Sequence, residues 1–436
     1  MRRAAIVFVI VCSARPVAER PATSASLFTK TFTVAARSEV LATIEAGCAR
    51  CDWGAAGREA AVLMLLVDGT YSQHLILARG DAPADYQVAL GTLEAGRHAL
   101  AIDRDPEWIA PAAGPPAVSR VDIRSIRSGD ADFDALSRAP ILFARANTVG
   151  RFTDLPILMW YEVVPTPRGR QLRYSVIFTN EDGGTATDRL MATWGRTTDI
   201  ELVYGVEVDD RGAVLGEQFQ GPGHAVPDFH GRHEARHPLL WVATDNNMVD
   251  ERGTTRARFA PAAERFDLRD RSREAVMDAH PWTYALAAKE MVREGKIDDD
   301  AAPGSGRIAD PRRFVFVEGC SELQNAGLVF SVRARDAGGG ERWFDSDRAQ
   351  AAFRIVRTGC FQGAVPVPAG AKPTAVRFRA FPSTAASAPA TQASVRVTRI
   401  NRVFTLGDDY LPRPSIFEWT GSLPLAIGGD WREVIF

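Results

Sequence analysis

The sequence VLMLLVDGTYSQHLIL, residues 62–77, places two apolar runs on either side of the dipeptide Asp68-Gly69. An Asp-Gly pair between two such runs is typical of a two-residue β-hairpin turn, because both central positions of that turn need positive φ angles. Each run is long enough for one strand. We therefore predict a β-hairpin here and a sheet around it.

Similar strand-like runs recur along the chain with turn signals between them, as expected of a protein built from sheets. The 436 residues exceed one ordinary domain of about 100–200 residues. We predict a mainly β fold of three β-sandwich-like domains, at residues 27–105, 118–297 and 312–436. A proline-, alanine- and glycine-rich stretch at 106–116 forms the predicted first linker. The middle domain has at least one α-helix, predicted at Thr283–Glu294 because helix-forming residues there precede Gly295.

Residues 1–26 match the pattern of a signal peptide and leader. Arg2 and Arg3 precede an apolar run at 4–11, and small residues follow. This run is shorter than the ~20 residues of a membrane-spanning helix, and no later stretch reaches that length. We expect a secreted or periplasmic protein with no transmembrane segment in the mature chain.

Four cysteines remain after the predicted leader, an even number that suits an oxidising compartment. Cys320 and Cys360 each lie near an apolar alternating run, so we predict a disulfide between neighbouring strands. Cys48 and Cys51 form either a local disulfide or half of a zinc knuckle. The sequence has no second Cys-x-x-Cys to complete a tetrahedral zinc site.

The charge composition gives no support for a nucleic-acid partner. The chain has 52 Lys and Arg residues against 54 Asp and Glu, and its arginines are scattered among the acids. A protein that binds a phosphate backbone normally shows a basic excess on one face. We therefore expect no nucleic-acid binding.

The densest polar stretch, residues 180–250, is the candidate site. Asp199 and Glu201 open a predicted strand, and the alternation of side chains along a strand puts both carboxylates on one face. Two adjacent carboxylates need a cation, an arginine or a shared proton to neutralise them. Asp188 lies upstream, in an acid- and glycine-rich loop whose oxygen atoms suit a hard cation. The predicted metal ligands, for calcium or magnesium, are Asp188, Asp199 and Glu201; the alternative is an ordinary acid pair neutralised by nearby arginines.

Further residues of this stretch are predicted to hold a ligand. Four of the seven histidines fall between residues 224 and 237, in a stretch whose prolines and glycines indicate a loop. Either these histidines are ordinary polar surface groups or, as their clustering indicates, one or two of them face a site. Residues 244–247 carry acid and amide groups that either bind sugar hydroxyls or form turns, and tryptophans either stack on a sugar or pack in the core. The predicted ligand-binding residues are Trp194, Arg196, His224, Asp245 and Asn246.

The segment Gly195-Arg196-Thr197-Thr198-Asp199-Ile200-Glu201 resembles the Gly-His-Arg-His-Asp-Trp-Glu heptapeptide of the necrosis-inducing protein family. Glycine, aspartate and glutamate agree, whereas both histidines and the tryptophan are replaced, and the resemblance is confined to residues 180–247. It implies a β-sandwich in which Asp199 and Glu201, with Asp188 upstream, hold a divalent cation that engages a sphingolipid head group.

Three hypotheses of function follow. In the first, the central domain binds a divalent cation and, through it, a glycan or polar lipid head group. In the second, the protein is an extracellular hydrolase or lyase of polysaccharides that uses the same carboxylates as general acid and base. In the third, it is a structural envelope protein whose polar loops contact partners.

Overall fold

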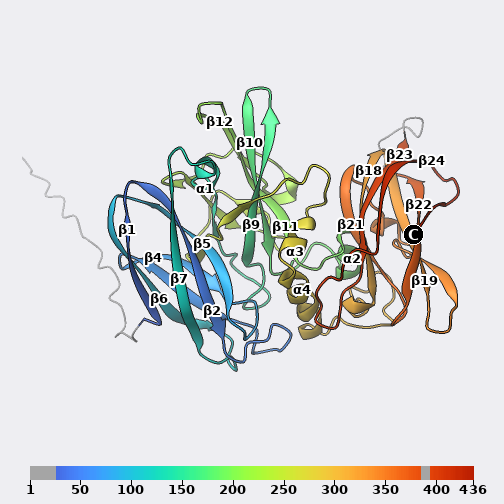
Figure 1. Ribbon diagram of the computed structural model, residues 1–436, viewed down its shortest axis with the longest axis horizontal. Coiled ribbons are helices and arrows are strands. Elements are labelled where there is room, and N and C mark those ends of the chain that lie inside the picture. Colours follow the sequence, from blue (N-terminus) through green and yellow to red (C-terminus); the bar gives the residue numbers. More distant parts are fainter. Residues whose placement is uncertain (1–25, 384–392) are drawn as a thin grey trace, which may run out of the picture.

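The computed structural model describes residues 26–383 and 393–436. Strands make up 50% of the chain and helices 9%, so the predicted mainly β fold is confirmed. Of the predicted leader, only Ser26 falls within the described residues. Three groups of sheets follow one another along the chain (Figure 1).

The N-terminal group is a sandwich of two antiparallel sheets, coloured blue to cyan in Figure 1. The first has the order β1 (Phe28–Val34), β6 (Gly96–Ile109), β3 (Ala61–Val67) and β4 (Thr70–Ile76). The second has the order β5 (Ala84–Leu93), β2 (Ser38–Cys48) and β7 (Pro116–Arg127). The predicted hairpin is confirmed: β3 and β4 pair around Asp68 and Gly69, whose φ angles are 49° and 78°.

The predicted boundary of this sandwich, at residue 105 with a linker at 106–116, differs from the structure. Strand β6 continues to Ile109, and β7 pairs with β2 from Ser38↔Arg127 to Cys48↔Pro116. The reason is that Val121 of β7 is buried in the core of this sandwich. Proline and glycine therefore mark a turn between two strands here, and the sandwich extends to Arg127.

The central group is built on a five-stranded sheet, whose strands β9, β10 and β11 are green in Figure 1. Its order is β12 (Val214–Phe219), β11 (Asp199–Val208), β10 (Gly169–Phe178), β9 (Pro156–Thr166) and β17 (Ala263–Arg265). A smaller sheet contains β13 (His233–Glu234), β14 (His237–Val242), β8 (Ile141–Phe143) and β16 (Arg258–Phe259), with β15 (Val249–Asp250) paired to β14.

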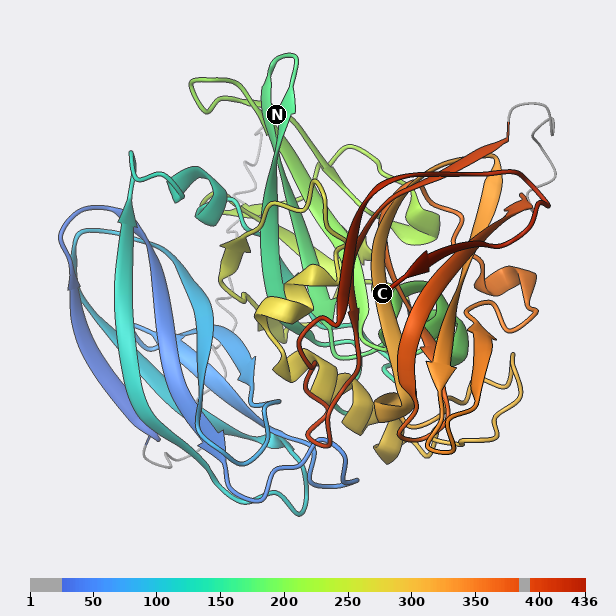
Figure 2. The same cartoon turned by 45° about the vertical axis from the view of Figure 1, so that its right-hand side comes forward.

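Four α-helices accompany these central sheets: α1 (Phe133–Leu136), α2 (Thr187–Trp194), α3 (Ala275–Ala279) and α4 (Trp282–Arg293). The predicted helix at Thr283–Glu294 is confirmed as α4, shifted by one residue at each end. Gly295, with a φ of 65°, follows it as expected of a residue just beyond a helix end. Both views place α3 and α4 between the two outer sandwiches (Figures 1 and 2).

The C-terminal group is a second sandwich. One sheet has the order β21 (Gly359–Pro366), β18 (Phe314–Gln324), β23 (Ser394–Phe404) and β24 (Phe417–Leu425), and the other β20 (Glu341–Asp345), β19 (Ala326–Arg335), β22 (Lys372–Pro382) and β25 (Arg432–Ile435). The predicted Cys320–Cys360 disulfide joins directly opposite residues of β18 and β21. Cys48 and Cys51 form the local disulfide, so they are not half of a zinc site. None of the helices in the described part of the chain combines the length and apolar character needed to cross a bilayer.

The three groups share hydrophobic cores where they meet. Tyr284 of α4 packs edge-on against Phe316 of β18 and Phe404 of β23, with ring centroids 6.1 and 5.9 Å apart. On the other side, Trp53 of the N-terminal sandwich is buried with Leu286 of α4, and its indole Nε1 donates a hydrogen bond of 2.7 Å to a Glu290 carboxylate. Shared cores of this kind hold the sheets around the candidate site in fixed positions.

Candidate functional site

A polar pocket of about 570 Å³, here called the central pocket, lies on the five-stranded sheet beside α2. Strand alternation places Glu162 of β9, Arg173 of β10 and Glu201 of β11 along it, while Ile200 points into the core. Arg357, which precedes β21, is contributed by the C-terminal group. The lining residues are Glu162, Arg173, Ser175, Glu181, Thr185, Arg189, Leu190, Trp194, Arg196, Asp199, Glu201, Leu202, Gln220, His224, Asn246, Arg273 and Arg357.

A tight turn between α2 and β11 brings several of the predicted residues to this pocket. Gly195 ends the helix with a φ of 60°, and its N–H donates a 2.9 Å hydrogen bond to the Met191 carbonyl oxygen. Such a left-handed residue reverses the chain direction after a helix. As a result Trp194 and Arg196, on either side of the glycine, both line the pocket.

Six of the eight predicted site residues line the pocket: Trp194, Arg196, Asp199, Glu201, His224 and Asn246. Asp188 does not, because it is buried within α2 and its Oδ2 accepts a 2.6 Å hydrogen bond from the Gly304 N–H. Asp245 is exposed beside Gly183, whose N–H donates to the Asp245 carbonyl oxygen at 3.1 Å. The sequence prediction of a shared face therefore applies to Asp199 and Glu201 and not to Asp188.

The predicted histidine cluster is dispersed in the fold. His224 lies at the exposed edge of the pocket. His233 contacts Glu217 at 2.9 Å, and buried His237 contacts Glu39 of the N-terminal sandwich at 3.2 Å. These histidines are close together in the sequence, but their imidazole groups lie at different places in the fold.

Asp199 is held in place by uncharged and charged donors. Only 3% of it is exposed, the Asn247 side-chain amide donates a 2.9 Å hydrogen bond to Oδ2, and Arg196 Nη1 lies 3.7 Å from Oδ1. Arg196 also donates to the Thr198 carbonyl oxygen and contacts Glu274 Oε1 at 3.1 Å. Burial raises the pKa of Asp199, the nearby Arg196 charge opposing this.

Two further carboxyl groups of the pocket hold protons near neutral pH. Burial, followed by repulsion from Asp199, raises the pKa of Glu181 to about 8. The same two causes raise the pKa of Glu201 to about 7, and the Gln220 side chain donates a hydrogen bond to this carboxylate. Burial also raises the pKa of Glu162. Groups that ionise near neutrality are suited to proton transfer.

The arginines of the pocket fall into two classes. Arg196 is buried and paired, as described above. Arg273 and Arg357 make no side-chain hydrogen bond or ion pair with any other described residue, and the buried Nε of Arg189 has no acceptor there. The guanidinium groups of Arg196 and Arg357 lie 5.9 and 5.8 Å from the centre of the Trp194 ring, which therefore orients arginines.

Five arginines and four carboxyl groups line the pocket. Arginines therefore outnumber carboxyl groups, and the pKa values of about 8 for Glu181 and about 7 for Glu201 add to the excess of positive charge near neutral pH. Within residues 26–383 and 393–436, no three His, Cys, Asp or Glu side chains are grouped so that they could hold a metal ion. The expected calcium or magnesium site stays a prediction, with arginine the nearest neutralising group of Asp199.

No role is predicted from the sequence for Arg273 or Arg357, and none for Glu162 and Arg173, which also line the pocket. Arg173 and Glu162 occupy paired positions on β10 and β9, so alternation along predicted strands was a usable signal for them. No local sequence pattern indicates a place for Arg357 in this pocket. It belongs to the C-terminal group and lies at the pocket because α2 packs against β21. Gly363 of β21 allows this packing, since a Cβ there would lie 2.7 Å from the Ala192 carbonyl oxygen.

Comparison with known proteins assigns no function to the central pocket. No protein-family model matches the chain, and no curated protein matches it. The resemblance of residues 195–201 to the necrosis-inducing protein family stays a prediction.

Proposed function

We propose that the protein works outside the cytoplasm and that its central pocket binds a saccharide that carries carboxylate groups. The observation that carries this proposal is the pair of guanidinium groups, Arg273 and Arg357, that line the pocket without a hydrogen-bond or ion-pair partner among the described residues. A guanidinium group matches a carboxylate with two parallel hydrogen bonds and is the side chain best suited to this recognition. The two disulfides suit an oxidising compartment, as does the predicted signal peptide.

The other side chains that line the central pocket suit a sugar better than a small inorganic anion. The lining includes side-chain amides, hydroxyls and carboxyls, with Thr185, Gln220 and Asn246 among them, and these groups offer donors and acceptors to hydroxyl groups. The volume of about 570 Å³ lies within the ~300–1,000 Å³ range of ligand sites. A ligand of this kind needs no metal ion, because arginines supply the positive charge.

A second candidate function, turnover of the bound sugar, is favoured by the pKa values of about 7 and about 8 at Glu201 and Glu181. In a β-elimination, a base removes the proton beside the sugar carboxylate and the adjacent carbon–oxygen bond breaks, its electron pair going to the leaving oxygen. An acid then gives that oxygen a proton. Ionised Glu201 is the candidate base and protonated Glu181 the candidate acid. Arginine on the sugar carboxylate would stabilise the developing negative charge.

The test is calorimetric titration of the purified protein with a galacturonate oligosaccharide and with the corresponding neutral galactose oligosaccharide. We expect binding of the acidic ligand only, weakened by salt because exposed charges are screened. The Arg273→Ala/Arg357→Ala double variant should lose at least ~30-fold in affinity, since hydrogen bonds to charged groups contribute ~1.5–3 kcal/mol each. Arg124→Ala, at an exposed position of β7, is the matched control and should bind like the parent.

Equal binding of the neutral sugar, or parental affinity in the double variant, would contradict the proposal. Loss of binding with a chelator, restored by calcium or magnesium, would instead favour the cation hypothesis. Binding of phospholipid head groups in place of both sugars would favour the head-group hypothesis. Ultraviolet absorbance from a new carbon–carbon double bond, absent in Glu201→Gln, distinguishes turnover from binding alone.

A further inference from the structure

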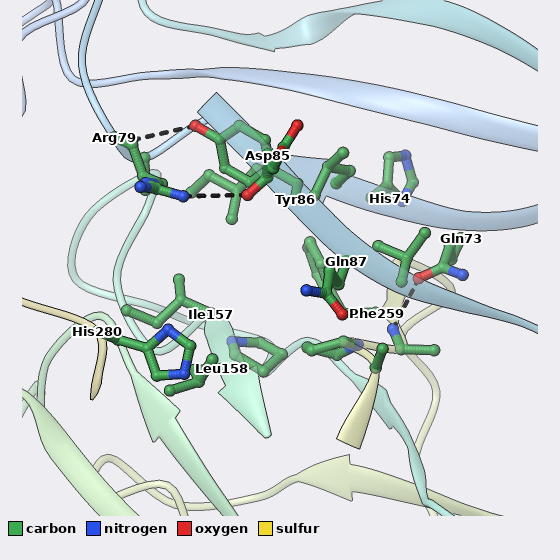
Figure 3. Close-up of a pocket in the computed structure, with 18 of the residues that line it drawn as sticks. Gln73, His74, Arg79, Asp85, Tyr86, Gln87, Ile157, Leu158, Phe259 and His280 are labelled. Carbon is green, nitrogen blue, oxygen red and sulfur yellow. Dashed lines mark hydrogen bonds between the residues drawn. The ribbon is translucent and has the colours of Figure 1, made fainter. Parts of the chain in front are cut away.

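A second pocket, of about 230 Å³ and here called the seam pocket, lies where the N-terminal sandwich meets the central group (Figure 3). Strands β4 and β5, which are edge strands of the two N-terminal sheets, form one side. The central group supplies the other side from three segments: 156–158, 259–264 and 280–282.

Backbone hydrogen bonds fix the two sides of the seam pocket. The Ala89 N–H donates to the Ala260 carbonyl oxygen at 2.9 Å, and the Ala262 N–H donates to the Gln87 carbonyl oxygen at 3.0 Å. The buried Gln73 side chain donates to the Ala89 carbonyl oxygen and accepts from the Ala260 N–H at 2.9 Å. The pocket is therefore formed by two rigidly joined surfaces.

The inner walls of the seam pocket are apolar. Ile76 and Val88 line it from the sandwich, and Ile157, Leu158 and Phe259 from the central group. Four of these five side chains are buried, Ile157 being half-buried. Such walls favour the hydrocarbon part of a ligand, because its binding removes apolar surface from water.

Three polar groups of the seam pocket have unused hydrogen-bonding capacity. The Gln87 side chain projects from β5 toward the opposite wall and has no hydrogen-bond partner among the described residues (Figure 3). His280 uses Nε2 to contact Glu264 Oε2 at 3.0 Å, while its Nδ1 has no described partner. Arg79 donates through Nη1 to the Asp85 carbonyl oxygen at 3.0 Å, and its Nε and Nη2 have no described acceptor.

Among the charged side chains that line the seam pocket, Arg79 is the one without an ion pair to another described residue. The carboxylate of Asp85 lies 3.1 Å from Arg120, and that of Glu264 contacts His280. The Arg79 guanidinium group lies 5.3 Å from the Trp282 ring centre and 6.0 Å from that of Tyr86, which hold it at the mouth. The seam pocket thus combines apolar walls with one positive charge that has no counter-charge.

We propose that the seam pocket binds a small carboxylic acid with one aromatic ring, as a site separate from the central pocket. The ring packs between Leu158, Ile157 and Phe259, the carboxylate pairs with Arg79, and Gln87 donates to it from the side. An apolar cavity of ~150 Å³ holds benzene, so 230 Å³ accommodates a ring with a short acidic chain.

The test uses 3-phenylpropionate as the probe and uncharged 3-phenylpropanamide as its matched analogue, by calorimetry and by ligand-observed NMR on the full chain. We expect one saturable site for the acid. Arg79→Ala should weaken binding of the acid at least ~10-fold and leave the amide unchanged, since only the acid forms the charged pair. Gln87→Trp, which fills the pocket from an exposed position, should abolish binding of both. Arg97→Ala, an exposed arginine on β6, is the control.

Three results would overturn the proposal. The first is no binding of the acid by the parent protein at ~10 mM, about ten times a millimolar Kd. The second is unchanged binding in Gln87→Trp, which would place the probe elsewhere. The third is an equal loss for acid and amide in Arg79→Ala at unchanged melting temperature, because the charge would then have no role.

Discussion

The central pocket and the seam pocket both contain arginine, but they differ in how that arginine is paired. In the central pocket, Arg196 is 4% exposed and contacts Asp199 and Glu274, whereas Arg273 and Arg357 have no hydrogen-bond or ion-pair partner among the described residues. In the seam pocket the single arginine, Arg79, contacts only a backbone carbonyl oxygen and two aromatic rings. We therefore expect the pairing of an arginine, and not its presence in a pocket, to separate a structural role from the proposed binding role.

The largest expected effect is on the free energy of unfolding, which should differ between variants of a paired and an unpaired arginine. Arg196→Ala removes the partner of two buried carboxyl groups, and breaking a buried ion pair costs ~3–5 kcal/mol because a charge is left without compensation. Arg79→Ala should change the free energy of unfolding by less than ~0.5 kcal/mol, as expected of an exposed side chain without an ion pair. Urea denaturation followed by tryptophan fluorescence measures both.

A double variant sharpens the same comparison. Glu274→Gln in the Arg196→Ala background removes one uncompensated carboxylate, so it should recover part of the lost stability. Equal stability losses in Arg196→Ala and Arg79→Ala would show that pairing does not separate the two roles.

Local patterns predicted the parts of the fold that depend on local periodicity. The Asp68-Gly69 hairpin and α4 were predicted because a turn dipeptide and a helix-ending glycine carry their own conformational preferences. The same alternation placed Asp199 and Glu201 at one pocket. Asp188 was misplaced because its segment, taken for a loop, begins α2 and directs the carboxylate to Gly304.

Features that depend on packing between distant segments could not be predicted in this way. Arg273 and Arg357 meet at the central pocket only because the central and C-terminal groups share a core around Tyr284. The seam pocket likewise needs the edges of two sheets and a second body of strands. Pro116, taken as part of a linker, begins β7, since pairing along β2 outweighs the local turn preference of proline.

A smaller effect is expected of pH on the affinity of the central pocket for the acidic saccharide. Glu201 and Glu181, with pKa values raised by burial to about 7 and about 8, are protonated at about pH 6 and ionised at about pH 9. Each ionisation adds a negative charge beside the bound carboxylate, so affinity for the acidic saccharide should fall ~10-fold as pH rises through this range.

Calorimetric titrations at both ends of the range, with Glu201→Gln and Glu181→Gln, check this expectation. Each variant should flatten the pH dependence, because a glutamine cannot ionise. Glu207→Gln is the control: hydrogen bonds from Arg168 and Thr166 lower the pKa of half-buried Glu207, which stays ionised throughout. Affinity that rises with pH in the parent would contradict the proposed placement of the ligand carboxylate.

The smallest effect is expected at Gln87 of the seam pocket. Gln87→Leu should change stability by less than ~0.5 kcal/mol, because this exposed amide has no described hydrogen-bond partner, and should weaken 3-phenylpropionate binding only ~2–10-fold. Gln73→Leu is the matched variant. It leaves the Ala89 carbonyl oxygen and the Ala260 N–H without the buried side-chain partners they have now, at a cost of ~1–3 kcal/mol for each unsatisfied group. Thermal melting should rank Gln73→Leu well below Gln87→Leu, and the reverse order would mean that Gln87 supports the fold and is not held free for a ligand.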